Sequence, residues 1–343
     1  MSTAKKRKES QKENNRENNR ESKTETKKAL IFDCDPGIDD AIALILFSKL
    51  LKEKDEKRER EKEKEGEEVK EGEEVKEEKN FQNVYIVATW GNVELKHTLR
   101  NSLFLRDFLG IQAKVVKGRE TSITGEIIHA KKVHGEDGLR GASLKYKPEK
   151  WKEDLSLDEL KQELKNYEEI RIIATGPLSS VAEIIQDKNL REKIKKIVWM
   201  GGAFFQDGNI TPYAEFNSYC DPVAVNFLFD FAKEKKCVTV VPLDATSKTL
   251  IKTEDLIKLS QTTKIKEFLK SITEGIKIIE LHDPLAVFSF FYKDSVKTFV
   301  SYPHVDTRSF RGKINSIITP NGFLKVVYDF DKEKFLEALK RSF

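Results

Sequence analysis

Short apolar runs alternate with longer segments of helical periodicity along most of the sequence beyond residue 28. Apolar runs bounded by turn residues predict buried strands, and five of them occupy 29–34, 83–90, 169–175, 195–201 and 237–243. Helical patterns lie between and after them, at 39–51, 95–109, 156–166, 179–188, 221–233 and, in pieces, 253–279. Strands linked through helices run parallel and need cover on both sides. The pattern therefore predicts an α/β fold with a mostly parallel central sheet and helices on both faces.

The last part of the sequence departs from this alternation. Residues 297–330 combine Val, Phe and Ile patterns with Pro and Gly breaks, which predicts a hairpin. Helical spacing returns at 331–340 and predicts a final helix. We therefore expect residues 29–343 to form a single domain.

Charged residues make up 35% of the chain and gather in two segments. Residues 1–28 hold ten basic and five acidic side chains and almost no apolar ones, so we expect a disordered tail. Residues 52–79 are charged at 24 of 28 positions and repeat Lys-Glu-Gly-Glu-Glu-Val at 64–69 and 70–75. A repeat this short cannot bury a face, and its glycines weaken a helix. We interpret residues 52–79 as a low-complexity insertion in a surface loop.

Overall composition excludes several classes of protein. The net charge of +4 is too small for the basic surface that binds nucleic acid. Cys34, Cys220 and Cys237 are too few and too scattered for a disulfide framework or a zinc cluster, which favours a reduced, cytoplasmic protein. We expect neither a membrane segment nor a secretory signal, because no apolar run approaches ~20 residues and none follows the charged start of the chain. The basic run at 5–8 leaves a nuclear location as an alternative.

Four carboxylates follow the first predicted strand within eight residues, at Asp33, Asp35, Asp39 and Asp40. Like charges this close repel one another, and nothing in folding requires them. A hard divalent cation would resolve the repulsion, because Ca²⁺ and Mg²⁺ take oxygen ligands. Asp35, Asp39 and Asp40 straddle a Pro-Gly turn and can converge on one point. The alternative, that Asp39 only caps the following helix, needs one Asp and not four.

Polar groups also follow the next strands, at the sheet edge where ligands of open α/β sheets bind. Asn92 follows a Trp-Gly turn after the second strand, although an ordinary turn asparagine would look the same. Gly176 and Pro177 end the third strand and leave the Thr175 carbonyl free. That carbonyl is a possible cation ligand, with an ordinary loop as the alternative.

Two later segments complete the candidate site. Small residues after Met200 let a ligand approach the backbone. Residues 208–217 then supply two amides and a carboxylate around an aromatic, a set that suits a polyhydroxy ligand such as a sugar. Asp283 opens the helix predicted at 283–291 and either caps it or completes the cation site. His282 beside it can act as an acid or as a donor to a base.

Together, the motifs at 33–41, 208–217 and 282–284 resemble the signatures of the inosine–uridine-preferring nucleoside hydrolase family, over nearly all of 29–343. The resemblance implies the open, Rossmann-like nucleoside hydrolase fold and hydrolysis of the N-glycosidic bond of ribonucleosides to free base and ribose. It implies a Ca²⁺ ion held by Asp35, Asp40, the Thr175 carbonyl and Asp283. It also implies that Asp39 deprotonates a Ca²⁺-bound water.

The same resemblance assigns the substrate contacts. Residues that would bind the ribose hydroxyls are Asn92, Asn209, Glu215 and Asn217, and Met200 would lie near the 5′ end. His282 would lie beside the leaving base. The segment 133–139 is similar to a family loop over the base, so His134 would contact the base as well. The charged insertion is not part of the family pattern, and we expect it to project away from the site.

Several questions stay open in the sequence. A histidine at 282 is similar to the non-specific or pyrimidine-preferring branch of the family, and the family implies a homodimer or homotetramer. The partner we expect is the ribonucleoside substrate, with neither nucleic acid nor membrane. A haloacid-dehalogenase-like phosphatase also begins with Asp-x-Asp after its first strand, but it does not explain residues 209–217. A non-catalytic nucleoside-binding protein is the second alternative.

Overall fold

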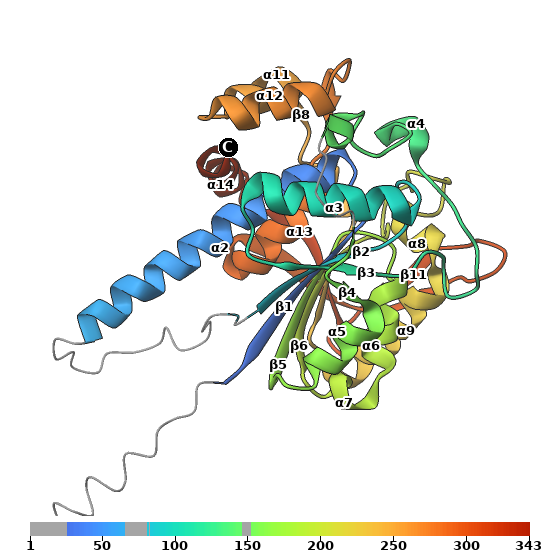
Figure 1. Cartoon of the computed structure of the whole chain (residues 1–343). Coiled ribbons are helices and arrows are strands. Elements are labelled where there is room, and N and C mark those ends of the chain that lie inside the picture. The colour runs from blue at the N-terminus through green and yellow to red at the C-terminus, as the bar shows by residue number, and fades with distance from the viewer. Residues whose placement is uncertain (1–25, 66–80, 82, 146–151) are drawn as a thin grey trace, which may run out of the picture.

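The computed structural model describes residues 26–65, 81, 83–145 and 152–343 (Figure 1). The basic run at 5–8, most of the predicted tail and the charged segment from residue 66 to 79 lie outside these residues. The predicted tail reaches one residue too far, because Lys28 already belongs to the first strand and forms an ion pair with Glu169.

Ten strands form one sheet in the order β11-β10-β12-β7-β6-β5-β1-β2-β3-β4. They are β1 (Lys28–Cys34), β2 (Asn83–Ala88), β3 (Lys114–Lys117), β4 (Leu155–Ser156), β5 (Glu169–Ala174), β6 (Ile194–Met200), β7 (Val238–Val241), β10 (Val296–Val305), β11 (Ile314–Ile318) and β12 (Leu324–Phe330). Pairing is parallel from β4 through β7 to β12, and only β10 runs antiparallel to its neighbours β11 and β12. The predicted parallel sheet with an added hairpin is confirmed.

Helices cover both faces of this sheet (Figure 1). One face is covered mainly by α2 (Ile38–Glu65), α3 (Leu95–Leu109), α11 (Thr253–Lys258), α12 (Thr263–Ile272), α13 (His282–Phe291) and α14 (Lys332–Ser342). The other is covered by α5 (Leu157–Leu164), α6 (Ser179–Gln186), α7 (Lys188–Arg191) and α9 (Pro222–Lys235). In β1, Leu30 and Phe32 face the first layer while Ala29 and Ile31 face the second. Alternate side chains of a strand point to opposite faces, which explains why this strand is apolar throughout.

Short elements complete the chain and shape the edge of the sheet. They are α4 (Lys131–His134), α8 (Phe216–Cys220), α10 (Leu243–Thr246), the 3₁₀ turns η1 (Ala142–Lys145) and η2 (Lys293–Ser295), and the two-stranded pair β8 (Ile251–Lys252) with β9 (Ile278–Ile279). No helix within the described ranges is both long and apolar enough to cross a membrane.

Helix α2 is much longer than the segment 39–51 predicted from periodicity. It continues to Glu65, 28 residues in all, or about 42 Å at the rise of an α-helix. The prediction of a loop from residue 52 is therefore wrong as far as Glu65. Lys, Glu and Arg, which make up nearly all of its second half, are good helix formers. Its first turn follows directly on β1 and contains Asp39 and Asp40, so it belongs to the acidic motif, the segment from Asp33 to Asp40. Its charged half runs away from the body of the molecule (Figure 1).

Packing of α2 on β1 fixes the carboxylate-bearing turn that joins them. Phe47 of α2 contributes to this packing through its contact with Phe32 of β1. The Phe47 ring is fully buried and lies 4.8 Å from the ring of Phe32, edge to face. We expect Phe47→Ala to lower the free energy of unfolding by about 3–5 kcal/mol, because it leaves a cavity in the core. Urea denaturation measures this loss. Leu250→Ala, at a side chain 61% exposed, is the control and should cost less than about 0.5 kcal/mol. A loss below about 1 kcal/mol at Phe47 would contradict this packing.

Candidate active site

A cavity of about 700 Å³ lies at the carboxyl ends of β1, β2, β5 and β6. Eleven of the twelve site residues predicted from the sequence line it, namely Asp35, Asp39, Asn92, His134, Thr175, Met200, Asn209, Glu215, Asn217, His282 and Asp283. The twelfth, Asp40, is fully buried and accepts hydrogen bonds from Asn92 and Thr175. Segments far apart in the sequence therefore meet at this edge of the sheet.

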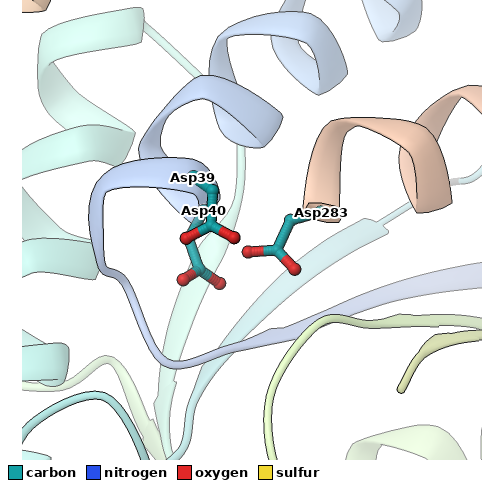
Figure 2. A group of neighbouring side chains, drawn as sticks. All are labelled: Asp39, Asp40 and Asp283. Carbon is teal, nitrogen blue, oxygen red and sulfur yellow. The ribbon is translucent and has the colours of Figure 1, made fainter. Parts of the chain in front are cut away.

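Three carboxylates converge beside the cavity. Asp39 and Asp40 lie in the first turn of α2 and Asp283 lies in the first turn of α13. One oxygen of each lies within 4.8 Å of the others, and Figure 2 shows the carboxylates turned toward a common space. An all-oxygen set at this spacing can hold a hard divalent cation.

The Asp40 carboxylate is fixed by three donors. Its Oδ2 accepts from the Gly37 backbone N–H at 3.0 Å and from Asn92 Nδ2 at 3.1 Å, and its Oδ1 accepts from Thr175 Oγ1 at 2.8 Å. Burial, with the charge of Asp39, nevertheless raises the pKa of Asp40 to about 7. Burial and neighbouring carboxylates raise the pKa of Asp283 in the same way. A cation between these groups would favour their charged forms.

Asp35 lies next to the acidic trio without belonging to it. Its Oδ2 accepts from the Asn92 backbone N–H at 2.7 Å, and its backbone carbonyl accepts from Asn92 Nδ2 at 3.0 Å. Glycines leave room for its carboxylate on two sides. A Cβ at Gly176 would lie 2.5 Å from Asp35 Oδ1, and one at Gly91 would collide with Oδ2. Burial and the charge of Asp40 raise the pKa of Asp35.

Asp33, the first carboxylate of the motif, is placed differently from the other three. It is fully buried, it does not line the cavity, and neither of its carboxylate oxygens has a hydrogen-bond partner among the described residues. Burial, with the charge of Asp40, raises its pKa well above the usual range. Asp33 thus belongs to the buried floor of the site.

The segment predicted to bind a sugar forms the opposite wall. Glu215 caps α8, and its carboxylate accepts from the backbone N–H groups of Gly202, Asn217 and Ser218 at 2.7, 2.8 and 3.0 Å. Burial raises the pKa of Glu215 despite these bonds. Asn217 Nδ2 donates to the carbonyls of Thr175 at 2.8 Å and Met200 at 3.1 Å. These bonds fix the two side chains and the Thr175 carbonyl in one wall.

Asn209 lies at the exposed rim of the same wall, where its Oδ1 accepts from the Phe216 backbone N–H at 2.8 Å. Its Nδ2 accordingly remains the part of the amide that can donate to a ligand. Asn209 and Asn217 therefore approach the cavity from the rim and from the interior respectively.

Two histidines face the cavity from different elements. His134 Nδ1 accepts from the Ile38 backbone N–H at 3.1 Å, and burial lowers the pKa of His134. His282 lies 2.8 Å from Thr246 through Nδ1 and 3.1 Å from Glu280 Oε2 through Nε2. Burial opposes the charged form of His282, but the bond to Glu280 and the charge of Asp39 outweigh it and raise its pKa. The surroundings of His134 thus favour its neutral form, whereas those of His282 favour its charged form.

The sequence analysis did not single out several other residues of the cavity, namely His129, Lys132, Ile276, Ile278, Ile279 and Glu280. Ile38 and Val133, which also line it, belong to the segments 33–41 and 133–139. Pairing of β8 with β9 brings residues 276–280 to the cavity, and no local sequence pattern predicts that pairing. Glu280 had a possible signal, because residues two apart on an extended segment point to the same side, and Glu280 precedes His282 by two.

Sequence comparisons relate the chain to known nucleoside hydrolases. The sequence profile of the inosine-uridine preferring nucleoside hydrolase family matches residues 75–337. A pyrimidine-specific ribonucleoside hydrolase, RihA, from Citrobacter koseri is 30% identical over 337 residues, which covers 90% of this chain and 96% of that protein. Uridine nucleosidase 1 from Arabidopsis thaliana is 29% identical over 272 residues, 75% of this chain and 72% of that protein.

Solved structures show the same relationship. A plant nucleoside hydrolase, the PpNRh1 enzyme, superposes with a TM-score of 0.73 at 25% identity, covering 92% of this chain and 98% of that one. A purine-preferring ribonucleoside hydrolase from Gardnerella vaginalis gives the same score and identity, covering 92% and 97%. The chain belongs to the inosine-uridine preferring nucleoside hydrolase family. The predicted family and the expectation of an N-glycosyl hydrolase are thereby confirmed.

The glycines around Asp35 give a test of its part in cation binding. In Gly176→Ala, the added Cβ would lie 2.5 Å from Asp35 Oδ1 and 2.9 Å from Thr89 Cγ2, so the carboxylate must move. If the site holds a divalent cation, we expect the affinity for it, measured by calorimetry, to fall at least about 10-fold. Gly110→Ala is the matched control, since nothing lies within 4 Å of its Cβ. The control should cost about 1 kcal/mol of stability through its positive φ and leave affinity unchanged. Equal affinity for the cation in Gly176→Ala and Gly110→Ala would show that Asp35 is not one of its ligands.

Proposed function

We propose that the protein hydrolyses the N-glycosidic bond of ribonucleosides of the uridine and inosine type, releasing free base and ribose with the help of Ca²⁺. The observation that carries the proposal is the convergence of eleven predicted site residues on one cavity. Carboxylates, amides and histidines all line it, and these are the groups that activation of water, binding of a sugar and departure of a base require.

The acidic groups suit Ca²⁺. The proposed ligands are the carboxylates of Asp35, Asp40 and Asp283 and the carbonyl of Thr175, which all offer oxygen. An oxygen of Asp39 lies within 4.8 Å of oxygens of Asp40 and Asp283. The raised pKa values of Asp35, Asp40 and Asp283 reflect burial and mutual repulsion, both of which a cation would offset. When bound, Ca²⁺ would lower the pKa of water and of ribose hydroxyls and orient them.

Asp39 is the proposed general base. It lines the cavity and belongs to the acidic trio, whereas Asp40 is fully buried and already accepts three hydrogen bonds. Of these two carboxylates, Asp39 is therefore the one with access to a substrate water. Removing a proton from that water creates the nucleophile that attacks the anomeric carbon of ribose.

The wall of amides and Glu215 would bind the ribose. Asn217 and Glu215 are fixed by backbone hydrogen bonds, so they present rigid polar groups to the sugar hydroxyls. We propose that Asn92 and Asn209 contact further hydroxyls and that Met200 lies near the 5′ end. Rigid positioning of the ring favours the oxocarbenium-like transition state of glycoside hydrolysis.

The leaving base would lie between the two histidines and the aliphatic side chains of the mouth. Ile38, Val133 and Ile278 line this part of the cavity and suit the faces of a base. His282 would donate to the base nitrogen as the glycosidic bond breaks, and His134 would contact the base.

The names of the relatives, uridine nucleosidase and pyrimidine-specific or purine-preferring hydrolases, support uridine and inosine as first substrates. The family resemblance also supports a homodimer or homotetramer, and the composition supports a cytoplasmic location.

A reducing-sugar assay tests the proposal. Purified protein is incubated with uridine, inosine, cytidine and adenosine, with Ca²⁺ or with a chelator. We expect ribose release that the chelator abolishes and added Ca²⁺ restores. No release from a folded, Ca²⁺-loaded protein would contradict the proposal and favour a non-catalytic nucleoside-binding protein. Release of phosphate from phosphate esters without release of ribose would instead favour the phosphatase alternative.

Asp39→Asn tests the general base. The amide keeps the shape of the side chain but cannot accept the proton, so we expect kcat to fall about 10²–10⁴-fold. The unfolding temperature and the binding of a nucleoside, measured by calorimetry, should change little. Asp255→Asn, an exposed carboxylate of α11, is the control. A kcat near that of the wild type would remove Asp39 from this role.

His282→Ala tests whether His282 donates a proton to the leaving base. The variant should lose most activity on uridine and inosine, whose bases leave poorly, by about 10²–10⁴-fold. It should lose little on 4-nitrophenyl riboside, whose leaving group needs no proton. Steady-state kinetics on both substrates give the ratio. Equal losses on both would show that His282 positions the substrate and does not protonate the base.

A further inference from the structure

Both ring nitrogens of His282 are engaged by partners from other parts of the chain. Nδ1 lies 2.8 Å from Thr246 Oγ1, and Nε2 lies 3.1 Å from Glu280 Oε2. Thr246 ends the short helix α10, and Glu280 follows β9. Neither contact lies within a motif of the sequence.

The two partners define an inner and an outer end of the imidazole ring. Thr246 is fully buried, so Nδ1 points toward the interior. The Glu280 side chain is 38% exposed and lines the cavity. Nε2 therefore points along the cavity wall, where a substrate base can approach. Fixing both ends prevents the ring from flipping and exchanging its nitrogens.

The chemistry of the outer partner determines where the proton lies. A carboxylate of Glu280 only accepts hydrogen bonds, so Nε2 must carry a proton to bond to it. Thr246 can donate to Nδ1 or accept from it, so it suits the neutral ring and the charged ring equally. In both states the proton on Nε2 is retained, because Glu280 favours that tautomer.

We propose that Glu280 is a positioning residue, which holds the His282 ring with a proton on Nε2 facing the base end of the cavity. The inference rests on the proposed function of His282 as donor to the leaving base and adds no chemical step to it. The second carboxylate oxygen of Glu280 accepts no hydrogen bond from the described residues. Glu280 can therefore turn away from Nε2 as the base takes its place.

A spectroscopic test does not depend on turnover. Long-range ¹H–¹⁵N correlation spectra of the five histidines distinguish the two neutral tautomers, and His282→Ala assigns the signals of residue 282. The wild type should show a proton on Nε2 of His282. Glu280→Ala should give a mixture of tautomers, while Glu280→Gln, whose amide oxygen also accepts, should restore the wild-type pattern. Glu274→Ala, an exposed carboxylate before the same strand, is the control. An unchanged tautomer in Glu280→Ala would overturn the proposal.

Kinetics supply the second test. Glu280→Ala should lower kcat on uridine or inosine at least about 10-fold, change KM little, and spare 4-nitrophenyl riboside. Glu280→Gln should recover most of the loss. Adding Glu280→Ala to His282→Ala should cause no further loss, because the residue acts through His282. Additive losses, or equal losses on both substrates, would overturn the positioning role.

The two tests separate this inference from the proposed function. If the wild type releases no ribose from any ribonucleoside, the proposed function fails, and the spectra still decide whether Glu280 fixes the tautomer of His282. If ribose is released and Glu280→Ala behaves as the wild type in both tests, the proposed function stands and the positioning role fails.

Discussion

Mutual repulsion among buried carboxylates is the constraint on which the site depends. Parallel pairing of β1 with β2 and β5 places the acidic motif at the carboxyl edge of a sheet that is covered on both faces. Asp35, Asp40 and Asp283 are almost entirely removed from water there. Backbone N–H groups, Asn92 and Thr175 satisfy some of their oxygens, yet burial still raises their pKa values. A cation is the partner that would convert this costly arrangement into a stable one.

Much of the fold and of the site follows from local sequence. Apolar runs and helical periodicity predict the central strands and most helices because each pattern is contained in one element. The twelve predicted site residues meet because the carboxyl ends of parallel strands share one edge. Asp33 shows the limit of this argument, since the sequence cannot distinguish a carboxylate in the floor of the site from one that faces the cavity.

The features that sequence reasoning missed depend on contacts between distant segments or on very short elements. Strand β4 has two residues, and β3 has only two apolar residues between lysines, too few for an apolar run. The extension of α2 to Glu65 was missed because the charged segment 52–65 lacks an apolar face, although its residues favour helix. Glu280 reaches His282 only through the pairing of β8 with β9. Glu280 also lies outside the motifs at 33–41, 208–217 and 282–284.

The central claim, that the buried carboxylates of Asp35, Asp40 and Asp283 form a divalent cation site, is tested most directly by equilibrium dialysis with Ca²⁺. The account predicts one tightly bound Ca²⁺ per chain in the wild type and its loss in the double variant Asp40→Asn/Asp283→Asn, with the fold retained by circular dichroism. The same stoichiometry and affinity in the double variant, or no bound Ca²⁺ in the wild type, would contradict it.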